Sequence, residues 1–176
     1  QCVDLDLDTN EITFVNRKTK ETLVHKTDVI FACDGAFSTV RYSGLQKTDR
    51  FNFSQNFIAD GYREILLPAN ADGTHKLDKN SLHIWPRGRF MLIALPNEDG
   101  SYTCTLFMPH EGGENSFDKV NTREEVDAFF KETFPDFYAL MPEIADQWEN
   151  HPLSSLAIMR SYPWHVNKTV LMGDAA

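Results

Sequence analysis

Two short turns built from glycine, alanine and aspartate are the segments best suited to chemistry. Asp34-Gly35-Ala36 and Gly173-Asp174-Ala175-Ala176 each come directly after an apolar run. Glycine and alanine allow a backbone to approach a pyrophosphate closely, while an aspartate carboxylate accepts hydrogen bonds from sugar hydroxyls. Either turn alone is typical of an ordinary strand ending, because Asp-Gly is a common turn dipeptide. Together they predict a dinucleotide site at the carboxyl ends of two strands.

The strands that must position these turns are typical of a parallel sheet. Residues 28–33 form a continuous apolar run, which we expect to be a strand buried on both faces, and residues 169–172 form a second strand of this kind. Ser38 is placed to cap a short helix after the first turn. Residues 3–7 and 11–15 flank a polar turn, which predicts a hairpin ahead of these elements.

The segment between the two turns has the pattern of an antiparallel sheet with helices. Turn residues at 86–88 and 97–100 help to separate four extended runs, which are 51–67, 82–85, 90–95 and 102–107.

Helices are expected in the second half of this segment. Thr122-Arg123-Glu124-Glu125 is a capping box, and apolar residues follow it at helical spacing, which predicts a helix over 122–134 that Pro135 ends. A second helical stretch is expected over 137–149, followed by an extended run over 153–162.

The order of these elements predicts an α/β fold with one domain inserted into another. Residues 1–50 and the return strand in 163–176 are expected to belong to a nucleotide-binding domain. Residues 51–162 are expected to form a substrate domain built on an antiparallel sheet.

Composition excludes several other classes of function. The formal net charge of -9, without a basic stripe, argues against a nucleic-acid partner. Cys2, Cys33 and Cys104 lack the spacing of a metal site or a disulfide framework, so we expect no metal and a reducing compartment. The apolar runs are too short to span a bilayer, so we expect a soluble segment without membrane contact.

The segment Cys33-Asp34-Gly35-Ala36-Phe37-Ser38-Thr39-Val40-Arg41 and the segment Gly173-Asp174-Ala175-Ala176 resemble two flavin motifs of the flavin-dependent aromatic hydroxylases. The resemblance implies part of a Rossmann-like FAD-binding domain, with FAD as cofactor, NADPH as co-substrate and molecular oxygen as oxidant. The cofactor-binding residues that it implies are Asp34, Gly35, Ala36, Ser38, Arg41, Gly173 and Asp174.

Three further segments resemble the members of that family that act on L-kynurenine. They are Leu82-His83-Ile84-Trp85-Pro86-Arg87, residues 90–97 and residues 103–109, and the resemblance extends over nearly the whole chain. It implies that Leu82, Ile93, Leu95 and Phe107 line the pocket for the substrate ring. The residues themselves show only that Ile93 and Leu95 share one face of a strand, and ordinary core packing is the alternative for all four.

The implied reaction is hydroxylation of L-kynurenine to 3-hydroxykynurenine. No catalytic acid or base is expected, because His83, His110 and His151 are scattered and the cofactor would carry the oxygen chemistry. Two alternatives stay open: a related flavin hydroxylase acting on another aromatic acid, and a non-catalytic module that binds a small ligand or a protein.

Both ends of the sequence favour an internal fragment of a longer protein. The chain begins without Met in a strand-like pattern, stops after an apolar run, and lacks a GxGxxG turn. We therefore expect these 176 residues alone neither to hold FAD tightly nor to hydroxylate a substrate. A cytoplasmic location is expected for a bacterial protein, and the mitochondrial outer membrane is the alternative that the resemblance implies for a eukaryotic one.

Overall fold

A computed structural model describes residues 1–176, and the chain divides into two compact units. We call residues 1–56 and 157–176 the flanking unit and residues 57–156 the central unit. Two long strands, β5 (Asn52–Leu67) and β9 (Ser154–Tyr162), run through the boundaries between the units. The domain boundaries predicted at 50/51 and 162/163 lie next to the first residue of β5 and the last residue of β9, respectively.

The flanking unit contains the parallel strand pair that the two apolar runs predict. β4 (Ile30–Ala32) pairs in parallel with β11 (Thr169–Leu171), and β10 (His165–Val166) adds to β11 in the antiparallel direction. The expectation that the first run is buried on both faces is wrong for this chain. Phe31 is 66% exposed, whereas its neighbours in β4 are buried, because successive side chains point to opposite faces and only one face is covered.

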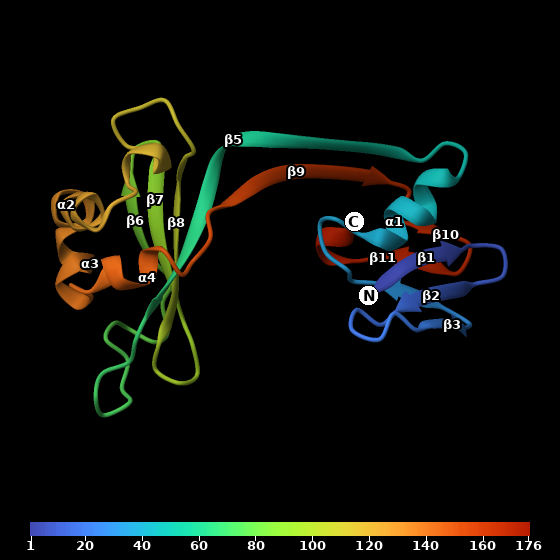
Figure 1. The fold of residues 1–176 in the computed structure, drawn as a ribbon, viewed down its shortest axis with the longest axis horizontal. Helices are drawn as coiled ribbons and strands as arrows, with labels where there is room; N and C mark the ends of the chain where they lie inside the picture. Colours follow the sequence, from blue (N-terminus) through green and yellow to red (C-terminus); the bar gives the residue numbers. More distant parts are fainter. The chain divides into compact units, whose positions relative to one another are not determined.

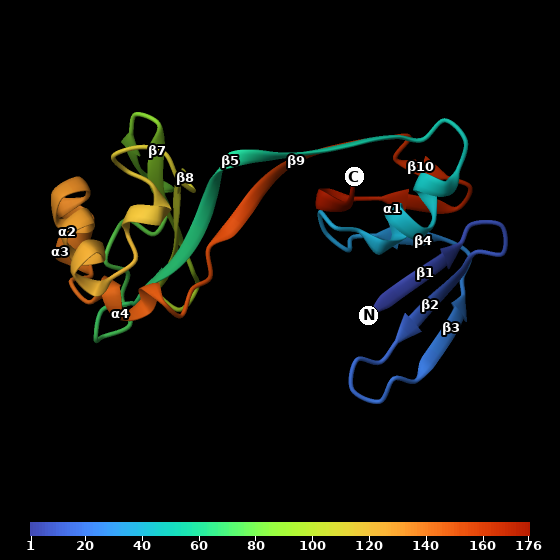
Figure 2. The ribbon, with the colours of Figure 1, turned by 45° about the horizontal axis from the view of Figure 1, so that its top comes forward.

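A three-stranded antiparallel sheet completes the flanking unit, and Figure 2 shows its strands side by side. The predicted hairpin is present as β1 (Cys2–Asp6) and β2 (Glu11–Val15), and β3 (Thr22–Lys26) extends it. No pattern in the sequence predicts β3, because all of its residues are exposed and it lacks the alternation of a half-buried strand.

Short helices follow both turns of the flanking unit. α1 (Thr39–Ser43) is capped by Ser38 and continues into the 3-10 helix η1 (Leu45–Lys47), while the 3-10 helix η3 (Gly173–Ala175) ends the chain. α1 packs on β1 so closely that a Cβ at Gly44 would lie 2.7 Å from Leu5. It would also lie 2.9 Å from the Val40 carbonyl oxygen, so a larger residue would require the backbone to shift.

The central unit is built on a sheet with strand order β6-β7-β8-β5-β9. Its other strands are β6 (His83–Arg87), β7 (Phe90–Pro96) and β8 (Tyr102–Pro109). β6 is longer than expected, because Pro86 and Arg87 belong to the strand and Arg87 pairs with Phe90. The turn is therefore the two residues 88–89, with Gly88 at a φ of +65°, as tight hairpins require.

Three helices cover one face of this sheet (Figure 1). They are α2 (Arg123–Thr133), α3 (Pro135–Leu140) and α4 (Ile144–Trp148), preceded by the 3-10 helix η2 (Phe117–Lys119). The capping box predicted at Thr122 is present. Pro135 does end α2, but it also begins α3, where a missing N–H costs nothing. The single stretch expected over 137–149 is two helices, with Pro142 in the break between them.

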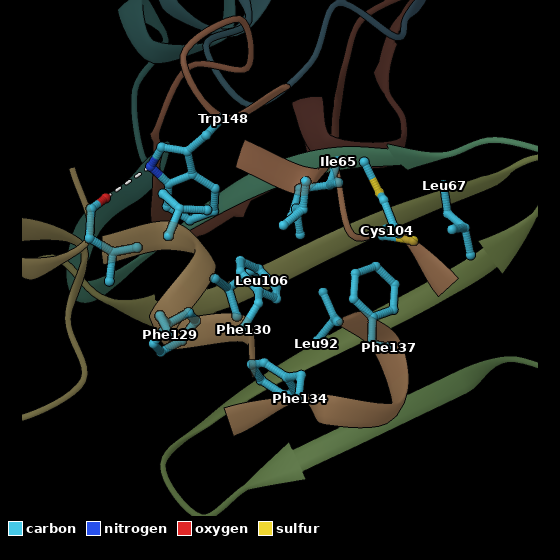
Figure 3. Packing of buried hydrophobic residues seen from close by; sticks show 14 of the residues in the cluster. Ile65, Leu67, Leu92, Cys104, Leu106, Phe129, Phe130, Phe134, Phe137 and Trp148 are labelled. Atoms are coloured by element: carbon cyan, nitrogen blue, oxygen red, sulfur yellow. Dashed lines mark hydrogen bonds between the residues drawn. The ribbon is translucent and has the colours of Figure 1, made fainter. Parts of the chain in front are cut away.

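The core of the central unit lies between the helices and the sheet. Figure 3 shows Leu92 and Leu106 of the sheet against a cluster of aromatic rings from the helices, and both leucines are fully buried. The Trp148 indole N–H donates a 2.9 Å hydrogen bond to the Val120 carbonyl and so closes one end of the core. None of the helices is both long and apolar enough to cross a membrane.

Candidate functional site

The two aspartate-containing turns leave the same edge of the flanking unit's small sheet. β4 and β11 are parallel, with Ala32 opposite Leu171, and the Met172 N–H donates a 2.9 Å hydrogen bond to the Ala32 carbonyl. Asp34 and Gly173 therefore follow neighbouring strands at their carboxyl ends. This is where open parallel sheets bind their ligands.

Both glycines of the turns have the backbone conformation and the free space that a closely approaching ligand requires. Gly35 has a φ of +83° and Gly173 a φ of +58°, which L side chains rarely adopt. A Cβ added to either glycine would meet no atom within 4 Å. The glycines thus leave the backbone uncovered, as a pyrophosphate or ribityl chain would need.

The first turn is held together by its own aspartate. The Ser38 hydroxyl donates a 2.5 Å hydrogen bond to Asp34 Oδ1, and the Val40 N–H donates a 3.1 Å bond to Asp34 Oδ2. Ser38 Oγ in turn accepts a 3.0 Å bond from the Arg41 N–H at the start of α1. Each carboxylate oxygen has two lone pairs, so the exposed Asp34 keeps capacity for a hydroxyl donor.

Arg41 connects the first turn to the second. Its Nη1 donates a 2.7 Å hydrogen bond to the Ala175 carbonyl, 134 positions away, and its Nη2 donates to the Ala36 carbonyl. The side chain is 3% exposed, and burial lowers the pKa of its guanidinium while the Asp34 carboxylate opposes that shift. A rigid guanidinium that holds both carbonyls sets the spacing of the two turns.

Two residues that the sequence did not single out support this cluster. The guanidinium of Arg41 lies over the Phe53 ring, 4.7 Å from its centroid, and the Ser161 hydroxyl donates to the Ala176 carbonyl. They belong to the ends of β5 and β9 in the flanking unit. No sequence pattern identifies Phe53 or Ser161, because an aromatic residue in a strand usually packs in a core and a serine in a strand usually lies on the surface.

The predicted cofactor-binding residues thus fall into two groups. Asp34 and Asp174 are exposed, and Gly35 and Ala36 are partly accessible, so a ligand can reach this turn and the exposed Gly173 directly. Ser38 and Arg41 are buried. Their contribution would be to hold the turns in place rather than to touch a ligand.

A second candidate surface lies on the central unit's sheet. We call it the open face, and it consists of Leu82, which directly precedes β6, and of the alternate residues of β5 to β8 that point away from the helices. They are Asp60, Tyr62, Glu64, Leu66, Leu82, Ile84, Pro86, Met91, Ile93, Leu95, Thr103, Thr105 and Phe107.

All four residues predicted to line a substrate pocket are on the open face. Leu82 is 52% exposed, Leu95 is 46% exposed, and Ile93 and Phe107 are partly buried. None of them belongs to the cluster beneath the helices. Within this chain they are therefore not part of the core, and their role in a substrate pocket stays a prediction.

The open face continues beyond the four predicted residues. Ile93 pairs with Ile84, Met91 pairs with Phe107, and the Tyr62 ring is 6.2 Å from the Phe107 ring. Ile84 and Met91 are largely exposed. The two-residue period through Ile93 could have identified Met91, whereas Ile84 and Tyr62 depend on strand register.

The polar and charged side chains of β6 face the helices instead. Trp85 donates a hydrogen bond to Asp136, and Arg87 lies over the Phe134 ring and donates to the Thr133 carbonyl. His83 packs edge-on against Tyr102. The open face therefore has no histidine, and its part along β6 and β7 is apolar.

Sequence comparison places the chain beside one group of proteins. It is 54% identical over 151 residues to a kynurenine 3-monooxygenase of Flavobacterium johnsoniae, a match that covers 85% of this chain and 33% of the relative. It is 48% identical over 176 residues to that of Dictyostelium discoideum, covering 99% of the chain and 37% of the relative. The chain thus spans about a third of the length of these curated relatives. No family model matches the sequence.

Solved structures share the fold. A 2-methyl-3-hydroxypyridine-5-carboxylic acid oxygenase matches all of this chain over 44% of its own, with a TM-score of 0.69 and 20% identity. HpxO of Klebsiella pneumoniae, solved with FAD and uric acid, matches 99% of the chain over 42% of its own, with a TM-score of 0.57 and 13% identity. The mixed α/β fold with antiparallel sheets is the fold of the corresponding part of these proteins, which confirms the predicted fold class.

Proposed function

Since this chain belongs by sequence to the homologues of kynurenine 3-monooxygenase, we propose that it forms part of an FAD-dependent aromatic monooxygenase. Its flanking unit would provide two of the turns that hold FAD, and its central unit would provide the surface against which the aromatic substrate lies. The proposed reaction is hydroxylation of L-kynurenine at the 3-position, with NADPH and molecular oxygen as co-substrates.

The observation that carries this proposal is the Arg41 bridge between the two turns at one sheet edge. The bridged turns provide two positive-φ glycines with open surroundings and two exposed aspartates, which are the groups that a dinucleotide needs. Asp174 would accept hydrogen bonds from the ribityl hydroxyls, and the exposed oxygens of Asp34 would accept from hydroxyls of the dinucleotide portion. The open space beside Gly35 and Gly173 supports this placement.

The open face suits an aromatic ring and a reaction that water must not reach. FAD, when bound and reduced, supplies the oxygen chemistry of such an enzyme. Leu82, Ile93 and Leu95 would hold the substrate ring by apolar contact and exclude water from it. The chain provides no acid or base on this face beyond Asp60 and Glu64, in keeping with a protein whose residues bind and orient.

A related hydroxylase with another substrate is the second candidate. The shared fold favours it, because one of the two solved neighbours above is named for a pyridine carboxylic acid and the other was solved with uric acid. The same fold therefore accommodates different rings, and the fold by itself does not choose among them.

A substrate panel separates the two candidates. The full-length protein, loaded with FAD, is titrated with L-kynurenine, 2-methyl-3-hydroxypyridine-5-carboxylic acid and uric acid, and binding is followed by the change in the flavin absorbance spectrum. Tight binding of L-kynurenine alone supports the proposal. Binding of another acid in its place would retain the hydroxylase and reject kynurenine, and failure to load FAD would reject both candidates.

A further inference from the structure

Residues 68–82 connect β5 to β6 without a helix or a strand, and we call them the connector. Connections longer than about 12 residues with no secondary structure of their own are uncommon and are often functional. The last residue of the connector is Leu82, one of the four residues predicted to line a substrate pocket. The course of the connector therefore decides where Leu82 lies on the open face.

Strand register places Leu82 beside Leu95. His83 pairs with Ala94 in the antiparallel pair of β6 and β7, so the residue before His83 lies opposite the residue after Ala94. Leu82 is 52% exposed and Leu95 is 46% exposed. With about half of its side chain uncovered, Leu82 depends mainly on its backbone for its position.

One side chain closes the turn in which Leu82 lies. His83, the first residue of β6, donates a 2.8 Å hydrogen bond from Nε2–H to the Asp78 carbonyl, because a carbonyl can only accept. The bond joins two residues on either side of Leu82. The Asp78 carboxylate accepts bonds from Asn80 and Ser81, which shape the turn itself. His83 attaches this turn to the strand.

The ring of His83 is itself held in place by Tyr102. The two rings meet edge-on with their centroids 5.8 Å apart. Tyr102 is fully buried, and its hydroxyl donates a 2.7 Å hydrogen bond to the Leu77 carbonyl in the connector. A ring that is fixed in this way presents its N–H in one direction, as the positioning of a neighbouring residue requires.

Resting on the proposed function, we propose that His83 is a positioning residue for substrate binding. Its bond to Asp78 holds Leu82 beside Leu95, so that the apolar surface for the substrate ring is formed before the ring arrives. His83 does not touch the substrate and acts through Leu82. A preformed surface binds more tightly than a mobile one, because fewer side chains have to be ordered on binding.

Equilibrium titration of the full-length, FAD-loaded protein with L-kynurenine, followed by flavin absorbance, tests this role. His83→Phe keeps an aromatic ring against Tyr102 and removes the donor, so it should weaken L-kynurenine binding about three- to tenfold. His83→Gln places an amide N–H near the position of Nε2, so its affinity should stay within about twofold of the wild type.

The effect of His83 on affinity should depend on Leu82. In a Leu82→Ala background, His83→Phe should change the affinity for L-kynurenine by less than about twofold, because the side chain that His83 positions is absent. A general structural role of His83 would instead give the same loss of affinity in both backgrounds.

His75→Phe is the matched control. His75 lies in the same connector, its Nε2 bonds the Asn97 carbonyl at 2.9 Å, and its ring meets the same Tyr102 edge-on at 5.5 Å. His75 is outside the turn that contains Leu82. His75→Phe should therefore lower the free energy of unfolding about as much as His83→Phe and leave substrate affinity unchanged. If His83→Phe does not fold, His83→Asn takes its place, because its amide is too short to reach the Asp78 carbonyl.

Four results would overturn the assignment. They are wild-type affinity in His83→Phe, a loss in His83→Gln as large as that in His83→Phe, an equal loss in His75→Phe, and an undiminished loss in the Leu82→Ala background. Failure of the wild-type, FAD-loaded protein to bind L-kynurenine would instead reject the proposed function, and this inference with it.

Discussion

Arg41 Nη1 donates a 2.7 Å hydrogen bond to the carbonyl oxygen of Ala175, and its Nη2 donates to the carbonyl of Ala36. One side chain thereby joins two turns that are far apart in the sequence and adjacent in the sheet. The guanidinium is suited to this role because its donors lie in one rigid plane. Its burial means that water does not compete for the two carbonyls.

Replacement of Arg41 by lysine should loosen both turns. A lysine ammonium is a point donor and does not reproduce the fork, so one carbonyl loses its partner at a cost of about 1–3 kcal/mol in the free energy of unfolding. FAD affinity of the full-length protein should fall by at least about tenfold, because a misplaced turn loses its contacts with the cofactor. Chemical denaturation and flavin fluorescence titration measure the two effects.

Arg17→Lys is the control for this substitution, since Arg17 is exposed in the same unit. It should change neither quantity. An Arg41→Lys protein with wild-type FAD affinity would show that the bridge does not set the geometry of the cofactor turns.

Gly173→Ala should separate backbone strain from cofactor binding. Gly173 has a φ of +58°, so alanine costs about 1–2 kcal/mol of stability, and the new methyl group projects into the open space where we propose that FAD lies. Gly73→Ala is the matched control, because Gly73 has a φ of +81° and equally open surroundings but lies in the central unit. Both variants should lose similar stability, while only Gly173→Ala should lose FAD affinity in equilibrium titration. Equal FAD affinities in the two variants would exclude the second turn from the cofactor site.

Leucine-to-alanine changes on β7 should distinguish the two faces of the central sheet. Leu92 is fully buried beneath the helices, so Leu92→Ala should cost about 2–5 kcal/mol in the free energy of unfolding. Leu95 is on the open face and 46% exposed, so Leu95→Ala should cost less than about 1 kcal/mol. It should nevertheless weaken L-kynurenine binding severalfold, measured by titration. Wild-type substrate affinity in Leu95→Ala would argue against this face as the substrate surface.

The stability of the protein should decrease at high pH in a way that depends on Cys104. Burial raises the pKa of this thiol from 9.0 to about 12, so between these values the unfolded chain has lost a proton that the folded chain keeps. The stabilisation from this thiol is fully present below pH 9, and between pH 9 and about 12 it falls by about 1.4 kcal/mol per pH unit. The free energy of unfolding of Cys104→Ala, taken from denaturation curves, should decrease less steeply with rising pH than that of the wild type. Identical slopes of the free energy of unfolding against pH in the two proteins would indicate that the thiol is in contact with water.

The parts of the fold that the sequence predicts are those governed by local patterns. Thr122 and Glu125 form the expected capping box, and the alternation of Ile93 and Leu95 places both on one face of a strand. The two glycine-containing turns are also predicted from local sequence, because glycine next to aspartate directly after an apolar run is typical of a strand that ends in a turn.

The remaining features depend on contacts between distant residues. The bond from Arg41 to a backbone carbonyl 134 positions away leaves no trace in the identity of Ala175. Phe31 is exposed although its apolar run predicted burial, because burial depends on what covers the strand. No pattern predicts β3, because its apolar residues Leu23 and Val24 are adjacent and exposed and do not alternate with polar ones. Its pairing with β2 depends on contacts that the local sequence does not show.

The most direct test of the proposed monooxygenase is NADPH oxidation by the full-length, FAD-loaded protein with and without L-kynurenine, while 3-hydroxykynurenine is quantified. We predict that L-kynurenine strongly stimulates NADPH oxidation and that 3-hydroxykynurenine accumulates in step with it. NADPH oxidation that L-kynurenine leaves unchanged, with no hydroxylated product, would contradict the assignment of this chain to a kynurenine hydroxylase.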